Sequence, residues 1–279
     1  SDATGVPMHR RGGKMQMAYL GASYTVDRFR RTVDQVLDEV LRKECAKSRP
    51  RPQHRRLYGD MTRALPDDLD TEFDGRVGVF SWLSHEVSTR SGDGSRPVIC
   101  LMDGEHKLWA RKRELLPDDV VEVLDLWHVM DRLWGVASAM HGADNTASRE
   151  FVSQRLRQIL AGNVGRVIGG LRQTLTKRRL PKAAAETITS TITYFSNNRD
   201  RMRYHECLRE GYPIASGVIE GACRHVVGDR LDRTGTRWSI DGAVSMLATR
   251  TTYLSDDWND YQQFRIKGEQ TRLHPTAKT

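Results

Sequence analysis

The sequence predicts an α/β protein that carries a large all-helical block. Two short apolar runs, at 98–102 and 120–124, are bounded by turn-forming residues and lie about twenty residues apart, which is typical of neighbouring buried strands. From 127 to 212, apolar residues recur at intervals of three and four, the spacing of helices that each bury one stripe. Both patterns in one chain indicate a sheet with flanking helices.

The first strand and the first helix are predicted from a change in the spacing of apolar residues. Residues 14–19 alternate, with Met15, Met17 and Tyr19 on one face, which indicates a strand at a sheet edge that continues toward Tyr24. From Val26 to Leu41 the apolar residues follow helical spacing, so we expect a helix of about five turns there.

The next stretch is predicted to be irregular. Residues 47–75 contain prolines at 50, 52 and 66 and a patch of four aspartates and one glutamate at 67–74, so we expect an exposed and mobile connection. A short helix is expected around 80–87, followed by a turn at 91–95.

Each of the two apolar runs ends in an aspartate, Asp103 and Asp125. In open α/β sheets the carboxyl ends of the strands form the usual ligand-binding edge, so this position favours a functional role. The alternative is that such an aspartate caps a turn or the next helix.

Two helices are expected after the helical block. One opens at Ser216 and Gly217, carries Glu220 and runs to about Leu231. The second begins after Ser239, a plausible N-cap, with apolar residues inward at 243, 244, 247 and 254.

Composition restricts the class of partner. The 279 residues carry a net charge of +8, and basic residues cluster at 49–56, 177–182 and 199–203, which suits a polyphosphate partner, although such clusters are also found on solvated helix faces. The four cysteines have no paired spacing, which argues against a zinc ribbon or a disulfide framework. We expect a cytoplasmic protein and no membrane span.

Six stretches together resemble the bacterial insertion-sequence transposases of the Kra group. They are Asp2–Met8, Val98–Gly104, Val123–His128, Ile214–Cys223, Arg230–Leu231 and Gly235–Ser239. Their order, with a helical block between Asp125 and Glu220, makes the set more specific than any one motif. The resemblance implies an RNase H-like mixed sheet with flanking helices and a large all-helical insertion before the last catalytic acid.

The same resemblance implies the site residues. Asp2 on the first strand, Asp103 at the end of the fourth and Glu220 after the insertion would form a DDE triad that holds two Mg²⁺ or Mn²⁺ ions. Asp125 and His128 look like the accompanying Asp-x-x-His. Asp125 would touch metal or orient His128, and His128 would contact a DNA phosphate or pack locally.

Several residues near Glu220 are candidate DNA contacts. Arg224 follows Glu220 by one helical turn and would meet a phosphate or pair with the carboxylate. Trp238 would stack on an unpaired base or belong to the core. Arg230, Arg233 and Arg237 are candidate backbone contacts.

We therefore expect the catalytic core of a transposase that cleaves and transfers DNA strands, assembling as a homo-oligomer on transposon ends and target. Asp2 stands where the strand leading into it is almost absent, which indicates an N-terminally truncated copy whose own activity is left open. The alternatives are a non-catalytic DNA-binding remnant and an RNase H-like nuclease. We divide the chain into a core at 1–126, an insertion at 127–212, core C-terminal helices at 213–255 and a tail at 256–279.

Overall fold

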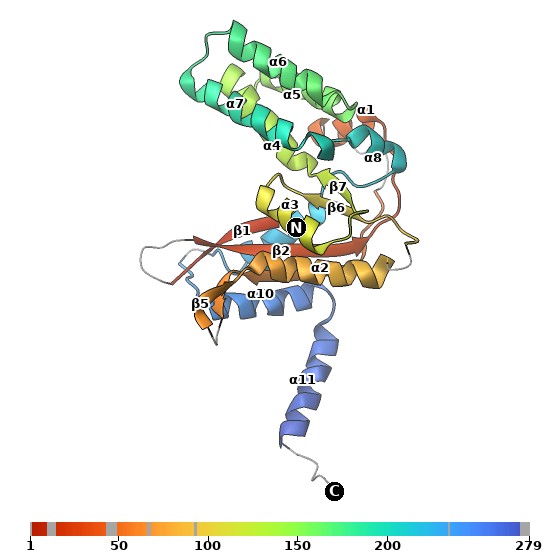
Figure 1. Cartoon of the computed structure of the whole chain (residues 1–279), viewed down its shortest axis with the longest axis vertical. Coiled ribbons are helices and arrows are strands. Elements are labelled where there is room, and N and C mark those ends of the chain that lie inside the picture. The colour runs from red at the N-terminus through yellow and green to blue at the C-terminus, as the bar shows by residue number, and fades with distance from the viewer. Residues whose placement is uncertain are drawn as a thin grey trace.

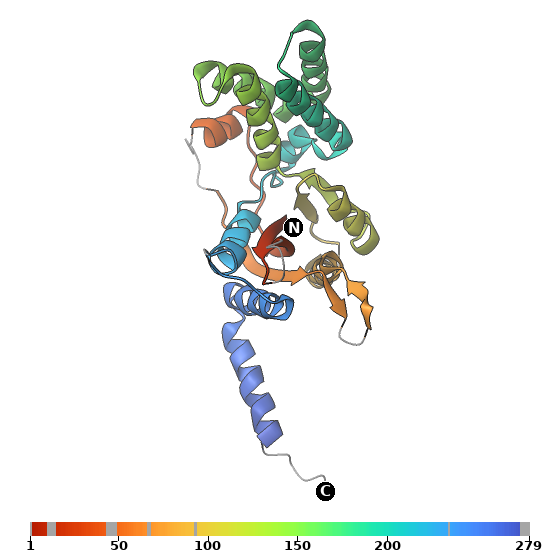
Figure 2. The ribbon, with the colours of Figure 1, turned by 90° about the vertical axis from the view of Figure 1, so that its left-hand side faces the viewer.

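The computed structural model describes residues 2–9, 15–42, 49–65, 68–91, 94–233 and 235–273. It is a mixed α/β structure, which confirms the predicted class. Figures 1 and 2 show an elongated molecule with a helical block at one end, strands in the middle and a single helix projecting from the other end. The start of the chain lies in the middle, below the helical block.

The largest sheet is antiparallel and has the order β1 (Asp2–Pro7), β2 (Met15–Thr25), β3 (Gln53–Met61). Side chains alternate along β2: Ala18 and Leu20 pack with α10 (Ile240–Leu254), while Tyr19 packs with α2 (Gly75–Ser91). Helices therefore cover both faces. The strand predicted at 14–19 is confirmed from Met15 onward, but it is central in its sheet, so its prediction as an edge was wrong.

The prediction of an irregular connection at 47–75 was wrong for most of that stretch. It contains β3 and a hairpin of β4 (Arg63–Leu65) and β5 (Asp68–Phe73). Two of the prolines precede β3 without interrupting it, and the third lies outside the described residues. The first half of β3 is exposed and basic, so no apolar alternation marks it; pairing with β2 makes it a strand.

The helix predicted from Val26 begins later. Helix α1 spans Val33–Leu37 and continues as the π-helical η1 (Asp38–Arg42). It starts at Thr32 because the Thr32 hydroxyl accepts the Gln35 N–H while the Gln35 side chain accepts the Thr32 N–H, a capping box. Upstream, the Phe29 N–H donates to the Gly211 carbonyl, a tertiary contact in place of a helical one.

The two strands predicted from the apolar runs are confirmed as β6 (Ile99–Met102) and β7 (Val121–Leu124), which pair in parallel. The crossover is α3 (His106–Leu115), and α2 extends beyond the helix expected at 80–87. The Asp125 N–H donates to the Met102 carbonyl at 2.8 Å, which places Asp103 and Asp125 at one edge. Among the described residues the hydrogen-bonded strands form three separate sheets, and Asp103 follows the sixth strand of the chain because the β4–β5 hairpin precedes it.

The predicted all-helical block is confirmed. It consists of α4 (Leu126–His141), α5 (Thr146–Leu160), α6 (Val164–Lys177), α7 (Lys182–Asn197), the 3₁₀ helix η2 (Arg199–Arg201) and α8 (Tyr204–Glu210). Asp125 and Asn145 cap the starts of α4 and α5, and glycines with positive φ follow three of the helices. One continuous apolar core joins the block to β6, β7 and α1.

The C-terminal region is α9 (Gly217–Ala222), the π-helical η3 (Cys223–Gly228), α10 and α11 (Trp258–Leu273). The Ser239 cap is confirmed, because its hydroxyl accepts the Gly242 N–H at 3.2 Å. The described part of the predicted tail is helix α11, which has no buried residue and projects from the body (Figure 1). None of the described helices has the length and apolar character needed to cross a membrane.

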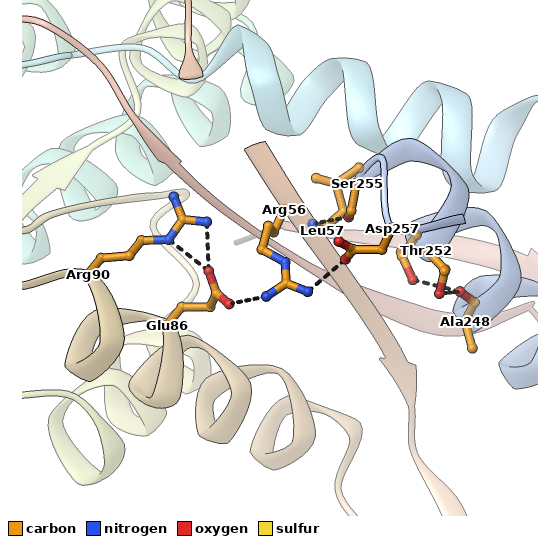
Figure 3. A network of polar contacts seen from close by, with 9 residues as sticks. Arg56, Leu57, Glu86, Arg90, Ala248, Thr252, Ser255 and Asp257 are labelled. Atoms are coloured by element: carbon orange, nitrogen blue, oxygen red, sulfur yellow. Dashed lines mark hydrogen bonds and ion pairs between the residues drawn. The ribbon is translucent and has the colours of Figure 1, made fainter. Parts of the chain in front are cut away.

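A polar network joins β3, α2 and the end of α10 (Figure 3). Arg56 donates to the buried Glu86 at 3.3 Å and to Asp257 at 2.7 Å, and Arg90 donates to Glu86 from the next turn of α2. The Leu57 N–H donates to the Ser255 hydroxyl at 2.8 Å. These contacts attach α10 to the sheet.

Glu122 on β7 provides a test of how the helical block is fixed to the strands. It lies 2.7 Å from the Arg201 guanidinium and 3.3 Å from the ammonium of the buried Lys112. Burial alone would raise the pKa of Glu122, but the hydrogen bonds and charges of Arg201 and Lys112 outweigh it, so the pKa is lowered. The ionised carboxylate is therefore favoured in the folded state.

We predict that Glu122→Gln weakens the pH dependence of unfolding. The pKa of Glu122 is lower in the folded state than in the unfolded chain, where it is about 4.3. The ionised side chain therefore stabilises the folded state above the unfolded pKa, and this stabilisation is lost as the pH falls through the folded pKa. At neutral pH the variant should lose roughly 1–3 kcal/mol of unfolding free energy, because the buried Lys112 loses its charged partner. Urea unfolding between neutral and acidic pH measures both effects, with Glu114→Gln, at an exposed position of α3, as the control. An unchanged slope in acid for Glu122→Gln would contradict the prediction.

Candidate metal centre

Three side chains from distant parts of the sequence converge beside the end of β6. Asp2 begins β1, Asp103 follows β6 and His128 lies in the first turn of α4. One ligand atom from each lies within 4.8 Å of the others, and all three residues are half-buried. The group could hold a metal ion.

Asp2 is fixed from both sides. Its Oδ1 accepts the Ala3 N–H at 2.8 Å and its Oδ2 accepts the Cys223 thiol at 3.5 Å. Burial, followed by the charge of Asp2, raises the pKa of Cys223, so the thiol stays a donor. The far end of β1 is held by Trp238, whose N–H donates to the Pro7 carbonyl at 3.1 Å and whose carbonyl accepts the His9 N–H.

Asp103 lies in a turn that the helical block covers. Its Oδ1 accepts the Glu105 N–H at 2.9 Å, and its backbone carbonyl accepts the indole N–H of Trp109 at 2.7 Å. The next residue, Gly104, donates its N–H to the Tyr194 hydroxyl of α7 at 3.0 Å. Burial and then the charge of Asp103 raise the pKa of Tyr194 to about 12, so the phenol stays neutral.

Asp125 is a capping residue. Its Oδ1 accepts the Trp127 N–H, and its Oδ2 accepts both the N–H and the hydroxyl of Ser216. The side chain is almost fully buried. These contacts support the capping alternative considered from the sequence: Asp125 places His128 by starting α4, while His128 itself joins the group that could hold a metal.

Glu220 is near this group but not part of it. It lies on α9, is exposed, and is not within the 4.8 Å cluster. Its pKa is raised by burial and then by Asp125, with His128 acting in the opposite direction and Asp2 adding to the increase. The structure therefore brings Asp2, Asp103 and His128 together and leaves Glu220 at their margin.

Glu105 is an acid that the sequence interpretation missed. It is half-buried at the start of α3, where its side chain makes no capping hydrogen bond. Burial and then the charge of Asp103 raise its pKa, and Asp2 also contributes. The sequence signal that could have identified Glu105 is its position two residues after Asp103, just past the end of a buried strand.

The predicted DNA contacts lie on η3 and the turn after it. Arg224, Arg230, Arg233 and Arg237 are all exposed. Trp238 is half-buried, packs on the β1–β3 core, and donates its indole N–H to the Leu231 carbonyl at 3.1 Å. This packing supports the core alternative for Trp238 over base stacking.

Comparison of the chain with protein-family models, curated proteins and solved structures gives no match. The resemblance to transposases of the Kra group therefore stays a prediction that depends on the six sequence stretches and their order.

We predict that Gly104→Ala disturbs the contact between the helical block and the Asp103 turn. A Cβ at position 104 would lie 2.6 Å from Cζ of Tyr194 and 2.8 Å from Nδ2 of Asn198. The expected loss of unfolding free energy is about 1–3 kcal/mol. In a Tyr194→Ala background the loss should shrink, because the ring is gone.

Gly169→Ala on α6 is the matched control, because its Cβ would meet nothing within 4 Å. It should stabilise the protein by roughly 0.5–1 kcal/mol, since alanine favours helix. Equal effects at the two positions would show that Tyr194 does not restrict the turn.

Proposed function

We propose that this chain is the catalytic core of a DDE-type transposase, which cleaves and transfers DNA strands with divalent metal. The observation that carries the proposal is the convergence of Asp2, Asp103 and His128 at the end of β6 in a chain of net charge +8. The six stretches that resemble the Kra group support it, and DNA is the proposed partner.

The ligand chemistry fits a hard divalent ion. Two carboxylates supply the oxygen ligands that Mg²⁺ and Mn²⁺ prefer, and His128 supplies one imidazole nitrogen. Glu220 and Glu105, whose carboxylates interact electrostatically with members of this group, would serve a second ion. When bound, such ions neutralise charge on the attacking and leaving oxygens of a phosphodiester.

The chain's own residues have separate roles in this proposal. Asp125 joins the starts of α4 and α9, the helices that carry His128 and Glu220. The four exposed arginines on η3 and its following turn would contact the DNA backbone. The reaction class is in-line attack by water, which frees a 3′-hydroxyl, followed by attack of that hydroxyl on target DNA.

One observation favours the non-catalytic alternative. Glu220, the third acid of the predicted triad, lies outside the 4.8 Å group. A DNA-binding protein without cleavage activity would bind DNA equally well with and without divalent metal. An RNase H-like nuclease would share the metal centre and would cut an RNA–DNA hybrid in preference to duplex DNA.

We predict that Asp103→Asn removes metal-dependent nicking of DNA. Loss of a central ligand should lower the rate at least about 100-fold, because charge neutralisation by metal contributes several kcal/mol. It should also remove the rise in melting temperature that Mn²⁺ gives the unmodified protein, since only a folded site binds the ion. Supercoiled plasmid and a thermal melt measure these two effects.

Asp118→Asn, an exposed aspartate in the turn before β7, is the control and should behave like the unmodified protein. Nicking that survives Asp103→Asn would reject the assignment. Mn²⁺ stabilisation without nicking would favour the non-catalytic alternative.

A further inference from the structure

A groove lies between α7 and the starts of α3 and α4, next in the chain to the Asp2–Asp103–His128 group. Its volume is about 1000 Å³, and its lining includes Gly104, His106, Arg132, Lys182, Tyr194 and Asn197. None of Arg224, Arg230, Arg233 and Arg237 lines it, whereas Lys182 and Arg201, from the basic clusters at 177–182 and 199–203, do. It is therefore a second surface with its own residues.

Two residues connect the lining of the groove to the candidate metal centre along the chain. Gly104 lines the groove and directly follows Asp103. Arg132 lies one helical turn after His128, on the same side of α4. A chain molecule bound at the metal centre would therefore pass next to Arg132.

Arg132 is well suited to meet a phosphate. It is exposed, its guanidinium lies 4.6 Å from the centre of the Tyr194 ring, and one N–H group donates to the Ser190 hydroxyl at 3.3 Å. Stacking on the ring orients the guanidinium, and a guanidinium has five donors, of which this contact uses one. Its planar fork matches phosphate oxygens.

The other charged groups in the groove leave a net positive field. Lys182 is highly exposed and lies 3.9 Å from Glu186, a distance at which an exposed pair contributes little. Arg201 pairs with Glu122, and its guanidinium lies 4.2 Å from the centre of the Trp109 ring. It therefore adds positive charge to the groove, while its guanidinium is already engaged. Three cations thus line the groove against the single acid Glu186.

We infer that this groove binds the sugar–phosphate backbone of DNA, with Arg132 and Lys182 as phosphate contacts, and leads that strand to the Asp2–Asp103–His128 group. The identity of the strand as DNA depends on the proposed function. The basic, hydroxyl- and amide-lined surface provides charge and hydrogen bonds along a backbone and no base-specific pocket, so the binding should be independent of sequence.

The test measures DNA binding without chemistry. Arg132→Gln, Lys182→Gln and the double variant are titrated against labelled duplex and single-stranded DNA by fluorescence anisotropy, in EDTA and over a range of salt. Arg172→Gln, an exposed arginine of α6 outside the groove, removes the same charge as the matched control. Arg132→Lys keeps the charge and removes the planar fork.

Each groove substitution should weaken binding about 5- to 10-fold, and the double variant should lower the slope of log affinity against log salt by about 1.4–1.8, at roughly 0.7–0.9 per phosphate contact. Arg132→Lys should fall between the unmodified protein and Arg132→Gln, and all variants should melt as cooperatively as the unmodified protein. Unchanged affinity and slope in the double variant, or an equal loss in Arg172→Gln, would overturn the inference.

The two proposals fail in different ways. If the double variant loses DNA binding and the unmodified protein does not nick DNA with metal, the groove inference holds and the proposed catalytic function is rejected. Normal nicking and normal binding in the double variant would keep the function and reject the groove.

Discussion

The buried carboxylate of Asp125 is the interaction on which the rest of the site depends. A buried charge is costly unless hydrogen bonds compensate it, and here three donors do so, one from the start of α4 and two from Ser216 before α9. Because Asp125 also continues the β6–β7 ladder through Met102, one residue sets the relative positions of a strand end and two helices. His128 and Glu220 are carried on those helices.

The second constraint is the contact between α7 and the turn after β6. Tyr194 leaves no room for a side chain at Gly104 and accepts the Gly104 N–H, so the helical block restrains the residue next to Asp103. The Tyr204 hydroxyl of α8 donates to the Leu124 carbonyl at the end of β7 in the same way. The helical block is therefore attached to the ends of β6 and β7, the strands that Asp103 and Asp125 follow. The segment inserted before Glu220 in the sequence thus helps to hold both strand ends.

What could be predicted from the sequence depended on local signals. Apolar runs with turn residues predicted β6 and β7, helical spacing predicted the block, and Ser239 predicted the start of α10. Strand β3 was missed because its first half is charged and exposed, and only pairing with β2 makes it a strand. His128 was predicted only as a support to the triad, and Trp238 had two alternatives, base stacking and core. Contacts with residues more than a hundred positions away decide both outcomes, and no spacing in the sequence records such contacts.

Charge is distributed unevenly between the site and its surroundings. The chain is basic as a whole, yet Asp2, Asp103, Glu105 and Glu220 place negative charge where, in the proposed function, a phosphodiester would lie. A phosphate brought there by arginines alone would meet carboxylates and be repelled at short range, where Coulomb energies are largest. Basic residues on η3 and α4 would supply long-range attraction, while only a cation among the carboxylates would allow close approach. The two sets of residues therefore have different tasks, and in this proposal neither can replace the other.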